Sequence, residues 1–474
     1  MAKIPPSLRI ISECFIQPYD VVTNSQQSKQ PFYLTPWDLV YIHPRFYVQR
    51  GLLFAIPPQP HYHFMKTLLD KLKHSLSLAL VHFFPLAGRL KSIKNKNPLS
   101  YSFYVDCNDS PGAKFIHGAL DNTTVSDILS STDVSEELIL QSLFDDDRTA
   151  NIDLHAMSLL TVHVTELMDG VFIGCGMSHF LADGNSFWHF FNMWSEIFQA
   201  QDQAAGNTKT ASISISRPPI LDRWFPDGHG PLINLPSTPF HGLDHHDNEH
   251  DSTKICEAPK FRVRTFHFSS QAIAKLKAKA NSEGETSKIS SFQSLSALVW
   301  RCITRVRRLQ PHQPTTCLVP VNTRSKLEPP LSQDYFGNSV GITVVVTTAG
   351  ELVGENGLGL AGWKLHQAVV NYNDKAVRKR LDAWLESPMF LNPQGGGLDP
   401  HWVMINGSAK FNTFGNEFGM GKALSFMLAR NTAISGKIVA HSGREEGSVD
   451  LEVCLPPDTM FDLESDQEFM EAAS

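Results

Sequence analysis

The segment between residues 159 and 198 constrains the fold more than any other part of the chain. Residues 159–167 (LLTVHVTEL) alternate as a strand does, Met168, Asp169 and Gly170 supply a turn, and residues 171–177 form a second, more apolar strand. Residues 185–198 (NSFWHFFNMWSEIF) then carry aromatic side chains at helical spacing after an Asn or Ser cap. A hairpin that passes through a short loop into a helix predicts mixed α/β structure.

The chain length predicts two lobes. Its 474 residues exceed the roughly 150 that one domain usually holds. Residues 201–259 are rich in Gln, Ala, Pro, His and Asp, which is typical of a linker. We therefore expect an N-terminal lobe at 1–200, a crossover loop at 201–259 and a C-terminal lobe at 260–474.

Sequence patterns place further elements in both lobes. Strands are predicted at 7–16, 101–107 and 113–115, with a short helix from Pro36 that Thr35 caps and a long helix from His63 to Phe84 that Pro85 ends. The second lobe is predicted to hold strands at 262–268, 316–321 and 340–347 and helices at 271–280, 291–308 and 363–382.

Composition excludes several classes of protein. A hydrophobic share of 42% indicates a folded chain, and a net charge of −7 gives no basic surplus for nucleic acid. Seven cysteines without a CxxC pair argue against a disulfide framework or a structural zinc site. With neither a leader pattern nor an apolar run of 18 residues, we expect no membrane association and a cytoplasmic location.

His179 is the candidate for chemistry, because it lies where the buried strand ends and glycines surround it. An imidazole with a pKa near 6.5 suits the removal of a proton from an alcohol or amine as it attacks a carbonyl. Asp183, four residues on, has three possible roles: it orients the imidazole as in a triad, pairs with an arginine, or joins His179 as a metal ligand. No third metal ligand lies nearby in the sequence, so we predict no metal.

A covalent mechanism would need a nucleophile. Cys175 precedes His179 by four residues, which span roughly 13 Å in a strand, and no GxSxG motif is present. We therefore predict a core thiol at Cys175 and direct attack by the acceptor.

Two motifs resemble those of a known family. Residues 179–184 (HFLADG) resemble the HxxxDG signature of the plant BAHD acyltransferases, and residues 417–422 (EFGMGK) resemble their DFGWGK signature. Further similar stretches lie at 34–38, 49–54, 84–90, 291–300, 321–324 and 335–338.

The resemblance implies a two-lobed chloramphenicol-acetyltransferase-like α/β fold, with a central tunnel that acyl-CoA and a small-molecule acceptor enter from opposite faces. It also implies a monomer with no permanently bound cofactor and acyl-CoA as co-substrate. His179 is then the general base, while Asp183 pairs with Arg324 and is structural together with Gly184.

The second motif departs from the family pattern at Glu417 and Met420, although Gly419 and Gly421 are kept. The resemblance gives this loop a structural role on the CoA side. Upstream, Ser408 matches a Ser-x-Trp stretch, but Lys410 stands in place of the aromatic residue. Lys410 either lines the acceptor pocket, where it would favour an anionic or polar acceptor, or points to solvent.

The phosphates of CoA need cations and N–H donors. Lys288, Ser290 and Ser291 lie at a predicted helix start, after Lys275, Lys277 and Lys279, and are the candidate site, although such a run is also typical of a solvated helix face. The run of His and Asp at 244–251 either binds metal weakly or belongs to a solvated loop.

Three functions are consistent with this sequence: acyl transfer from acyl-CoA to a hydroxyl or amine of a small specialised metabolite, a lyase or other activity without CoA on the same fold, and non-catalytic binding of small molecules. His179 and Gly184 argue against the third, because a protein without catalysis has no chemical need for the base and the open loop.

Overall fold

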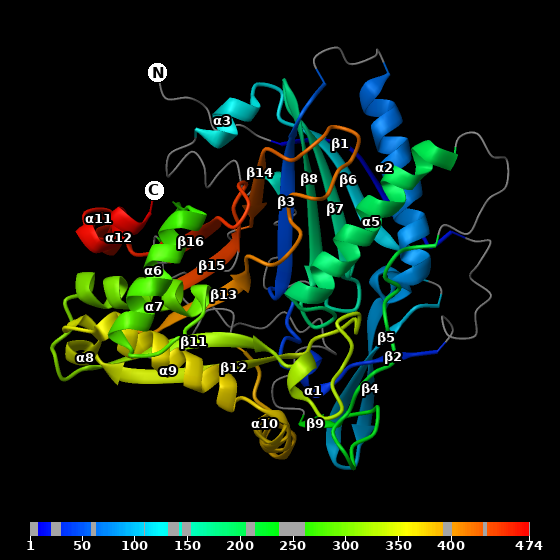
Figure 1. Ribbon diagram of the computed structural model, residues 1–474. Helices are drawn as coiled ribbons and strands as arrows, with labels where there is room; N and C mark the ends of the chain where they lie inside the picture. Colours follow the sequence, from blue (N-terminus) through cyan, green and yellow to red (C-terminus); the bar gives the residue numbers. More distant parts are fainter. Residues whose placement is uncertain are drawn as a thin grey trace, which may run out of the picture.

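The computed structural model describes residues 8–19, 30–57, 63–108, 110–130, 142–144, 153–204, 214–236, 261–391, 401–429 and 434–473. Two large sheets, each with its own covering helices, form the two halves of the molecule (Figure 1). The run of His and Asp at 244–251 lies outside the described residues, as do Cys256 and residues 131–141.

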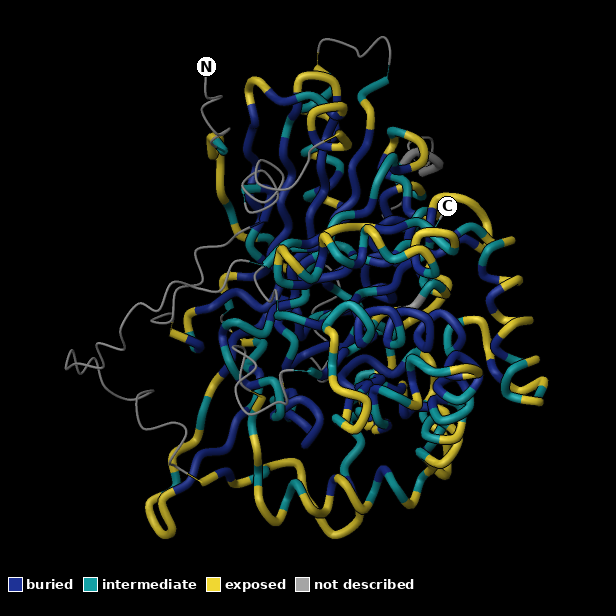
Figure 2. The backbone as a smooth tube through the Cα atoms, turned by 90° about the vertical axis from the view of Figure 1, so that its left-hand side faces the viewer, coloured by how far each residue is buried: buried dark blue, intermediate teal, exposed yellow. Residues whose placement is uncertain are grey.

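The first sheet contains the predicted hairpin. Its strands, in spatial order, are β1 (Arg9–Ile16), β6 (Ala113–Ala119), β7 (Leu160–Glu166), β8 (Gly170–Ser178), β3 (Tyr47–Ala55) and β14 (Ser425–Leu428). β7 and β8 are antiparallel, with Leu160 opposite Met177, whereas β6 and β7 are parallel. Every residue of β8 is buried, as expected for a central strand, and Figure 2 shows buried backbone through the strands and exposed backbone at the periphery.

Two long helices cover one face of this sheet (Figure 1): α2 (Phe64–His82) and α5 (Gly184–Ala204). Their apolar side chains form one core with β3, β7 and β8. The predicted stop of the first helix is nearly correct. α2 ends at His82, and Pro85 lies in the 3-10 turn Phe84–Ala87 that follows, where its missing N–H costs no helical bond.

The second sheet has the order β10 (Arg262–Phe268), β16 (Val449–Leu455), β15 (Lys437–Ser442), β13 (Val403–Ser408), β11 (Pro314–Asn322) and β12 (Val340–Thr348). A separate core joins it to α6 (Ser270–Glu283), α7 (Ser291–Val306), α8 (Ala349–Val353) and α9 (Gly357–Asn371). The predicted strands and the first two predicted helices of this half are confirmed.

The helix predicted at 363–382 is wrong as a single element. The structure has α9 and then α10 (Asp374–Glu386), separated at Tyr372 and Asn373. The side chain of Asn373 accepts the Ala376 N–H at 3.1 Å and caps the new helix. Asparagine favours such a cap over a helix interior, and this preference outweighed the apolar spacing.

A small third sheet contains β4 (Arg89–Lys96), β5 (Leu99–Asp106), β2 (Phe32–Tyr33) and β9 (Leu235–Pro236). The short helices α1 (Pro36–Leu39), α3 (Val125–Leu129), α11 (Pro457–Glu464) and α12 (Gln467–Ala472) complete the described elements. Since β9 pairs with β5, part of the proposed crossover loop belongs to folded structure.

One strand from beyond the proposed boundary at residue 260 belongs to the first sheet. β14 comes late in the chain but pairs with β3 of the first sheet, with Ser425 opposite Leu53. Phe418, just before it, is fully buried in the first core. β14 thus connects the later part of the chain to the first sheet. The division into 1–200, 201–259 and 260–474 remains a prediction.

Candidate active site

The backbone of His179 is held from two sides directly after β8. Its N–H donates to the carbonyl of Phe46 at 2.8 Å, and its carbonyl accepts the side-chain amide of Asn338 at 2.7 Å. Its ring stacks on that of Tyr41, with centroids 3.8 Å apart and planes 4° from parallel. Two other segments, residues 41–46 and Asn338, thus hold His179 at the end of the strand.

The surroundings of His179 favour the neutral ring. The side chain is half-buried, and burial lowers its pKa below the ordinary 6.5, with the charge of Arg50 acting in the same direction. Its own backbone carbonyl, Asp183 and Asn338 oppose this lowering without reversing it. Nδ1 is buried without a hydrogen-bond partner among the described residues. A neutral imidazole at neutral pH is in the form that accepts a proton.

Asp183 pairs with Arg324, as the family resemblance implies. Arg324 Nη1 donates to Asp183 Oδ2 at 2.7 Å and Nη2 to Oδ1 at 3.1 Å, with both side chains fully buried. Burial alone would raise the pKa of Asp183, but the Arg324 charge and the hydrogen bonds bring it below its usual value. Asp183 makes no hydrogen bond to His179, so of the three possible roles the arginine pair is the one that the geometry supports.

Asp183 also begins the helix that follows. Its Oδ1 accepts the Ser186 N–H at 2.9 Å, and its backbone carbonyl accepts that of Phe187. The predicted Asn or Ser cap is therefore wrong. α5 starts at Gly184, because the carboxylate one residue earlier already satisfies an N-terminal N–H.

Cys175 is a core thiol, as predicted. It is fully buried in the first core, and burial raises its pKa. A protonated, inaccessible thiol does not act as a nucleophile.

A second buried pair lies beside the first. The Asp38 carboxylate accepts Arg223 Nη2 and both nitrogens of Asn338, the side-chain amide at 2.9 Å. The same Asn338 amide nitrogen donates to the His179 carbonyl. A continuous set of buried hydrogen bonds thus joins Arg223 to the backbone of His179.

Tyr41, Arg50 and Asn338 were not predicted as site residues, although Arg50 and Asn338 lie in stretches that resemble the family. Arg50 is a single charged residue shortly before the apolar Leu52, Leu53 and Phe54, and this pattern could have indicated a buried charge. Tyr41 had no signal, since only the tertiary fold places it on His179.

The altered second motif packs firmly. Ser195 of α5 accepts the backbone N–H of Glu417 at 2.9 Å and donates to its carbonyl at 3.0 Å. Phe418 packs among aromatic side chains, and its ring centroid lies 4.9 Å from that of Trp194. Gly419 and Gly421 have φ of +76° and +75°, a backbone conformation that glycine adopts without strain. The backbone of the loop and Phe418 therefore hold the loop in place despite the departures from the family pattern at Glu417 and Met420.

The remaining predicted residues lie elsewhere. Lys288, Ser290 and Ser291 are exposed at the start of α7, where the Ser290 side chain accepts the Gln293 N–H. Lys410 is exposed in the turn after β13, which favours the solvent alternative for it. The backbone of Ser408 lies opposite His441, and its side chain lies outside the described residues. The proposed roles of these five residues remain predictions.

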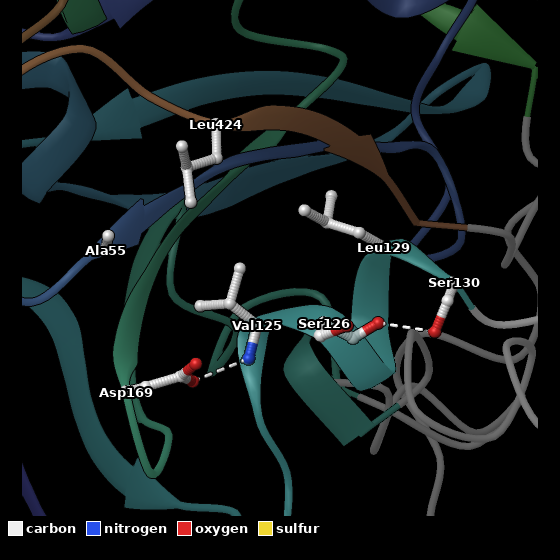
Figure 3. Close-up of a pocket in the computed structure, with 7 residues that line it drawn as sticks. All are labelled: Ala55, Val125, Ser126, Leu129, Ser130, Asp169 and Leu424. Carbon is white, nitrogen blue, oxygen red and sulfur yellow. Dashed lines mark hydrogen bonds between the residues drawn. The ribbon is translucent and has the colours of Figure 1, made fainter.

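His179 does not line either of two prominent surface hollows in the described part of the chain. One of about 430 Å³ lies between α3 and the β3–β14 edge, where Asp169 accepts the Val125 N–H (Figure 3). The other, of about 570 Å³, is lined by residues of α7, α11 and the turn before β15. The tunnel implied by the resemblance remains a prediction.

Within the described ranges, no group of three or more His, Cys, Asp or Glu side chains could hold a metal ion. The same ranges contain no helix long and apolar enough to cross a membrane. None of the six cysteines in these ranges forms a disulfide bond.

Comparison with known proteins identifies the family. The model of the transferase family matches residues 14–470. An uncharacterized acetyltransferase of Arabidopsis thaliana is 35% identical over 465 residues, covering 97% of this chain and 98% of the relative. The BAHD acyltransferase DCR of the same plant is 27% identical over 472 residues, with coverage of 98% and 92%. The chain belongs to the BAHD acyltransferases of the transferase family.

Solved structures show the same fold. Vinorine synthase superimposes with a TM-score of 0.69 at 20% identity, covering 99% of both chains. Fusarium graminearum TRI101, solved with ethyl coenzyme A, gives 0.65 at 18% identity and covers 94% of this chain and 99% of its own. These confirm the predicted α/β fold class, and the family assignment makes the chain an acyltransferase of the BAHD type.

Proposed function

We propose that this protein transfers an acyl group from an acyl-CoA thioester to a hydroxyl or amine of a small specialised metabolite, with His179 as general base. The observation that carries the proposal is the fixed, half-buried and neutral imidazole at the end of β8. An acceptor that reaches Nε2 meets a base of suitable basicity in a fixed orientation.

The chemistry needs one base and no covalent intermediate on the enzyme. Since Nδ1 is buried, the proton of the acceptor O–H or N–H goes to Nε2 of His179. The acceptor oxygen or nitrogen attacks the thioester carbonyl, and the C–S bond then breaks. The proton passes from the imidazolium to the CoA thiolate, which yields an ester or amide and free CoA thiol. Asp183 and Arg324 keep the loop that bears His179 in place.

The donor is proposed to bind at the start of α7. Ser290 caps this helix by accepting the Gln293 N–H, and Lys288, Ser290 and Ser291 are all exposed at its start. A helix N-terminus next to a cation suits a phosphate of CoA. Ser408 is proposed to line the acceptor pocket, whereas the exposure of Lys410 favours its solvent alternative. TRI101, which shares this fold, was solved with ethyl coenzyme A.

The alternative of a lyase without CoA was suggested by the altered second motif. Its support weakens because the loop at 417–421 still packs through Ser195 and Phe418.

The release of free CoA thiol tests the proposal. Purified protein is incubated with a set of acyl-CoAs and pooled plant alcohols and amines, and thiol is followed together with acylated product by mass spectrometry. We expect acceptor-dependent thiol release with at least one pair. If no acyl-CoA is consumed and calorimetry detects no acyl-CoA binding, the lyase alternative replaces the transferase.

A further inference from the structure

Arg50 is a cation in the interior of the first lobe. It lies on β3 opposite Cys175 of β8, in a strand that continues with Leu52, Leu53 and Phe54. Its guanidinium lies 5.2 Å from the ring centroid of Phe187 and 5.7 Å from that of Trp188, both on α5. Cation–π contacts of this kind hold the side chain against the helix but do not neutralise its charge.

The Arg50 guanidinium makes no hydrogen bond or ion pair with any residue that the structure describes. The carboxylate of Asp183 is close enough to influence it electrostatically, but that group already accepts Arg324, the Ser186 N–H and the Ser339 N–H. The two buried arginines nearby, Arg223 and Arg324, each bind an aspartate. Arg50 therefore differs from its neighbours in lacking an anion.

The side chain lies close to His179 and to the second sheet. Its charge lowers the pKa of His179, and of His441 and Lys437 on β15. Lys437 and His441 alternate along β15 with the apolar Ile438 and Ala440. Because Ile438 and Ala440 face the helices of the second lobe, Lys437 and His441 lie on the other face of the strand. Val439 on that face packs against the first core. Arg50 thus lies where the two lobes meet.

The guanidinium packs closely against Gly184. A Cβ at this position would lie 3.3 Å from Arg50 Nη2 and 3.7 Å from the ring of Phe411. A larger residue there would crowd the Arg50 side chain. Arg50 remains partly exposed, so a ligand can reach it.

An unpaired charge in such a place is costly, and burial lowers the pKa of Arg50 to about 10. The planar guanidinium offers parallel N–H donors that match a carboxylate. We infer that Arg50 binds a carboxylate group of one of the two substrates, beside His179. This inference rests on the proposed function for the identity of the substrates, and it narrows them to a pair in which the acceptor or the acyl group is an acid.

Ligand binding tests this without catalysis. Acetate, malonate, benzoate and 3-hydroxybenzoate are each compared with their methyl esters by thermal shift and calorimetry, on wild type, Arg50→Gln and Arg50→Lys. We expect at least one acid to bind wild type about 10- to 100-fold more tightly than its ester, with the preference lost in Arg50→Gln and partly kept in Arg50→Lys. Arg9→Gln, which changes an exposed arginine on β1, is the control and should keep the preference.

Donor binding identifies the source of the carboxylate. A preference for malonyl-CoA over acetyl-CoA that depends on Arg50 assigns it to the acyl group, whereas an effect on free acids alone assigns it to the acceptor. Equal binding of every acid and its ester, or a preference that survives Arg50→Gln, overturns the inference.

The stability of the unliganded protein gives a second measurement. Because Arg50 has no anionic partner, Arg50→Gln should leave the melting temperature unchanged or raise it. A melting temperature as low as that of Arg324→Gln would assign Arg50 a structural role and overturn the inference. Arg50-dependent binding of acids without any thiol release would refute the proposed function and leave this inference standing. If thiol is released but Arg50→Gln lowers kcat equally for acids and esters, the inference fails and the transferase stands.

Discussion

Asp183 and Arg324 lie 141 positions apart in the sequence and are joined by two hydrogen bonds with both side chains fully buried. The pair connects the loop that carries His179 to the turn after β11, and therefore the first half of the molecule to the second. The same carboxylate starts α5 through Ser186. One side chain thus holds the loop of His179, starts α5 and joins the two halves of the molecule.

Removing either partner should destabilise the fold strongly. Asp183→Ala or Arg324→Ala leaves the other charge buried, so each should lower the free energy of unfolding by about 3–5 kcal/mol. The double variant should lose much less than the sum. Chemical denaturation measures all three. The exposed pair Arg9 and Asp121 provides the matched control, where the same substitutions should leave the free energy of unfolding almost unchanged. Strict additivity of the two buried changes would show that they are not partners.

The proposed donor site predicts a change confined to acyl-CoA. Replacing Lys288 and Ser290 together by Ala should raise the KM for acyl-CoA and leave that for the acceptor nearly unchanged, since only anchoring of the donor is lost. The increase should fade as salt rises, because exposed charges are screened over about 8 Å at physiological ionic strength. Lys91→Ala, on exposed β4, is the control. An unaltered donor KM at low salt would place the CoA site elsewhere.

The stack of Tyr41 on His179 predicts a positioning role for the tyrosine ring. Tyr41→Phe keeps the stack and should keep kcat, whereas Tyr41→Ala frees the imidazole and should lower kcat by about 10²-fold with little change in KM. Steady-state kinetics with one acceptor separates the two. An equal loss in both variants would mean that the hydroxyl, whose pKa burial raises to about 12, is needed instead.

Much of the fold could be predicted from local patterns. The hairpin at β7 and β8 and the amphipathic α2 followed from alternation and helical spacing, which act over a few residues. β14 could not be predicted, because its four residues (SFML) fit a strand or a helix equally and only pairing with Leu53 decides between them. The break before α10 depended on one capping asparagine.

The site was predictable only where a motif marked it. His179, Asp183 and Arg324 followed from the resemblance, and the structure brings the last two together. Tyr41, Asn338 and Arg50 come from three other segments, and their contacts exist only after the sheets have assembled. The cap of α5 was misassigned since Asp183, Asn185 and Ser186 are all good capping residues, and the bonds that Asp183 makes decide among them.

The lowered pKa of His179 predicts the pH profile of the reaction. The base must be neutral, so with an alcohol acceptor kcat/KM should be flat through neutral pH and fall only below the ordinary imidazole pKa of 6.5. Since the charge of Arg50 lowers this pKa, Arg50→Gln should move the acidic limb to higher pH. The profile is measured for both proteins at constant ionic strength. A limb well above pH 6.5 in wild type, or no displacement in the variant, would contradict this electrostatic account.

The most direct test is the kcat of His179→Ala in the thiol-release assay, with the acyl-CoA and acceptor pair that wild type uses. The hydrogen bonds that hold residue 179 are made by its backbone, so the variant should fold and melt like wild type, while kcat falls by about 10²–10⁴-fold. His312→Ala, at an exposed turn, should retain full turnover. Wild-type turnover in a folded His179→Ala protein would contradict the assignment of His179 as the base.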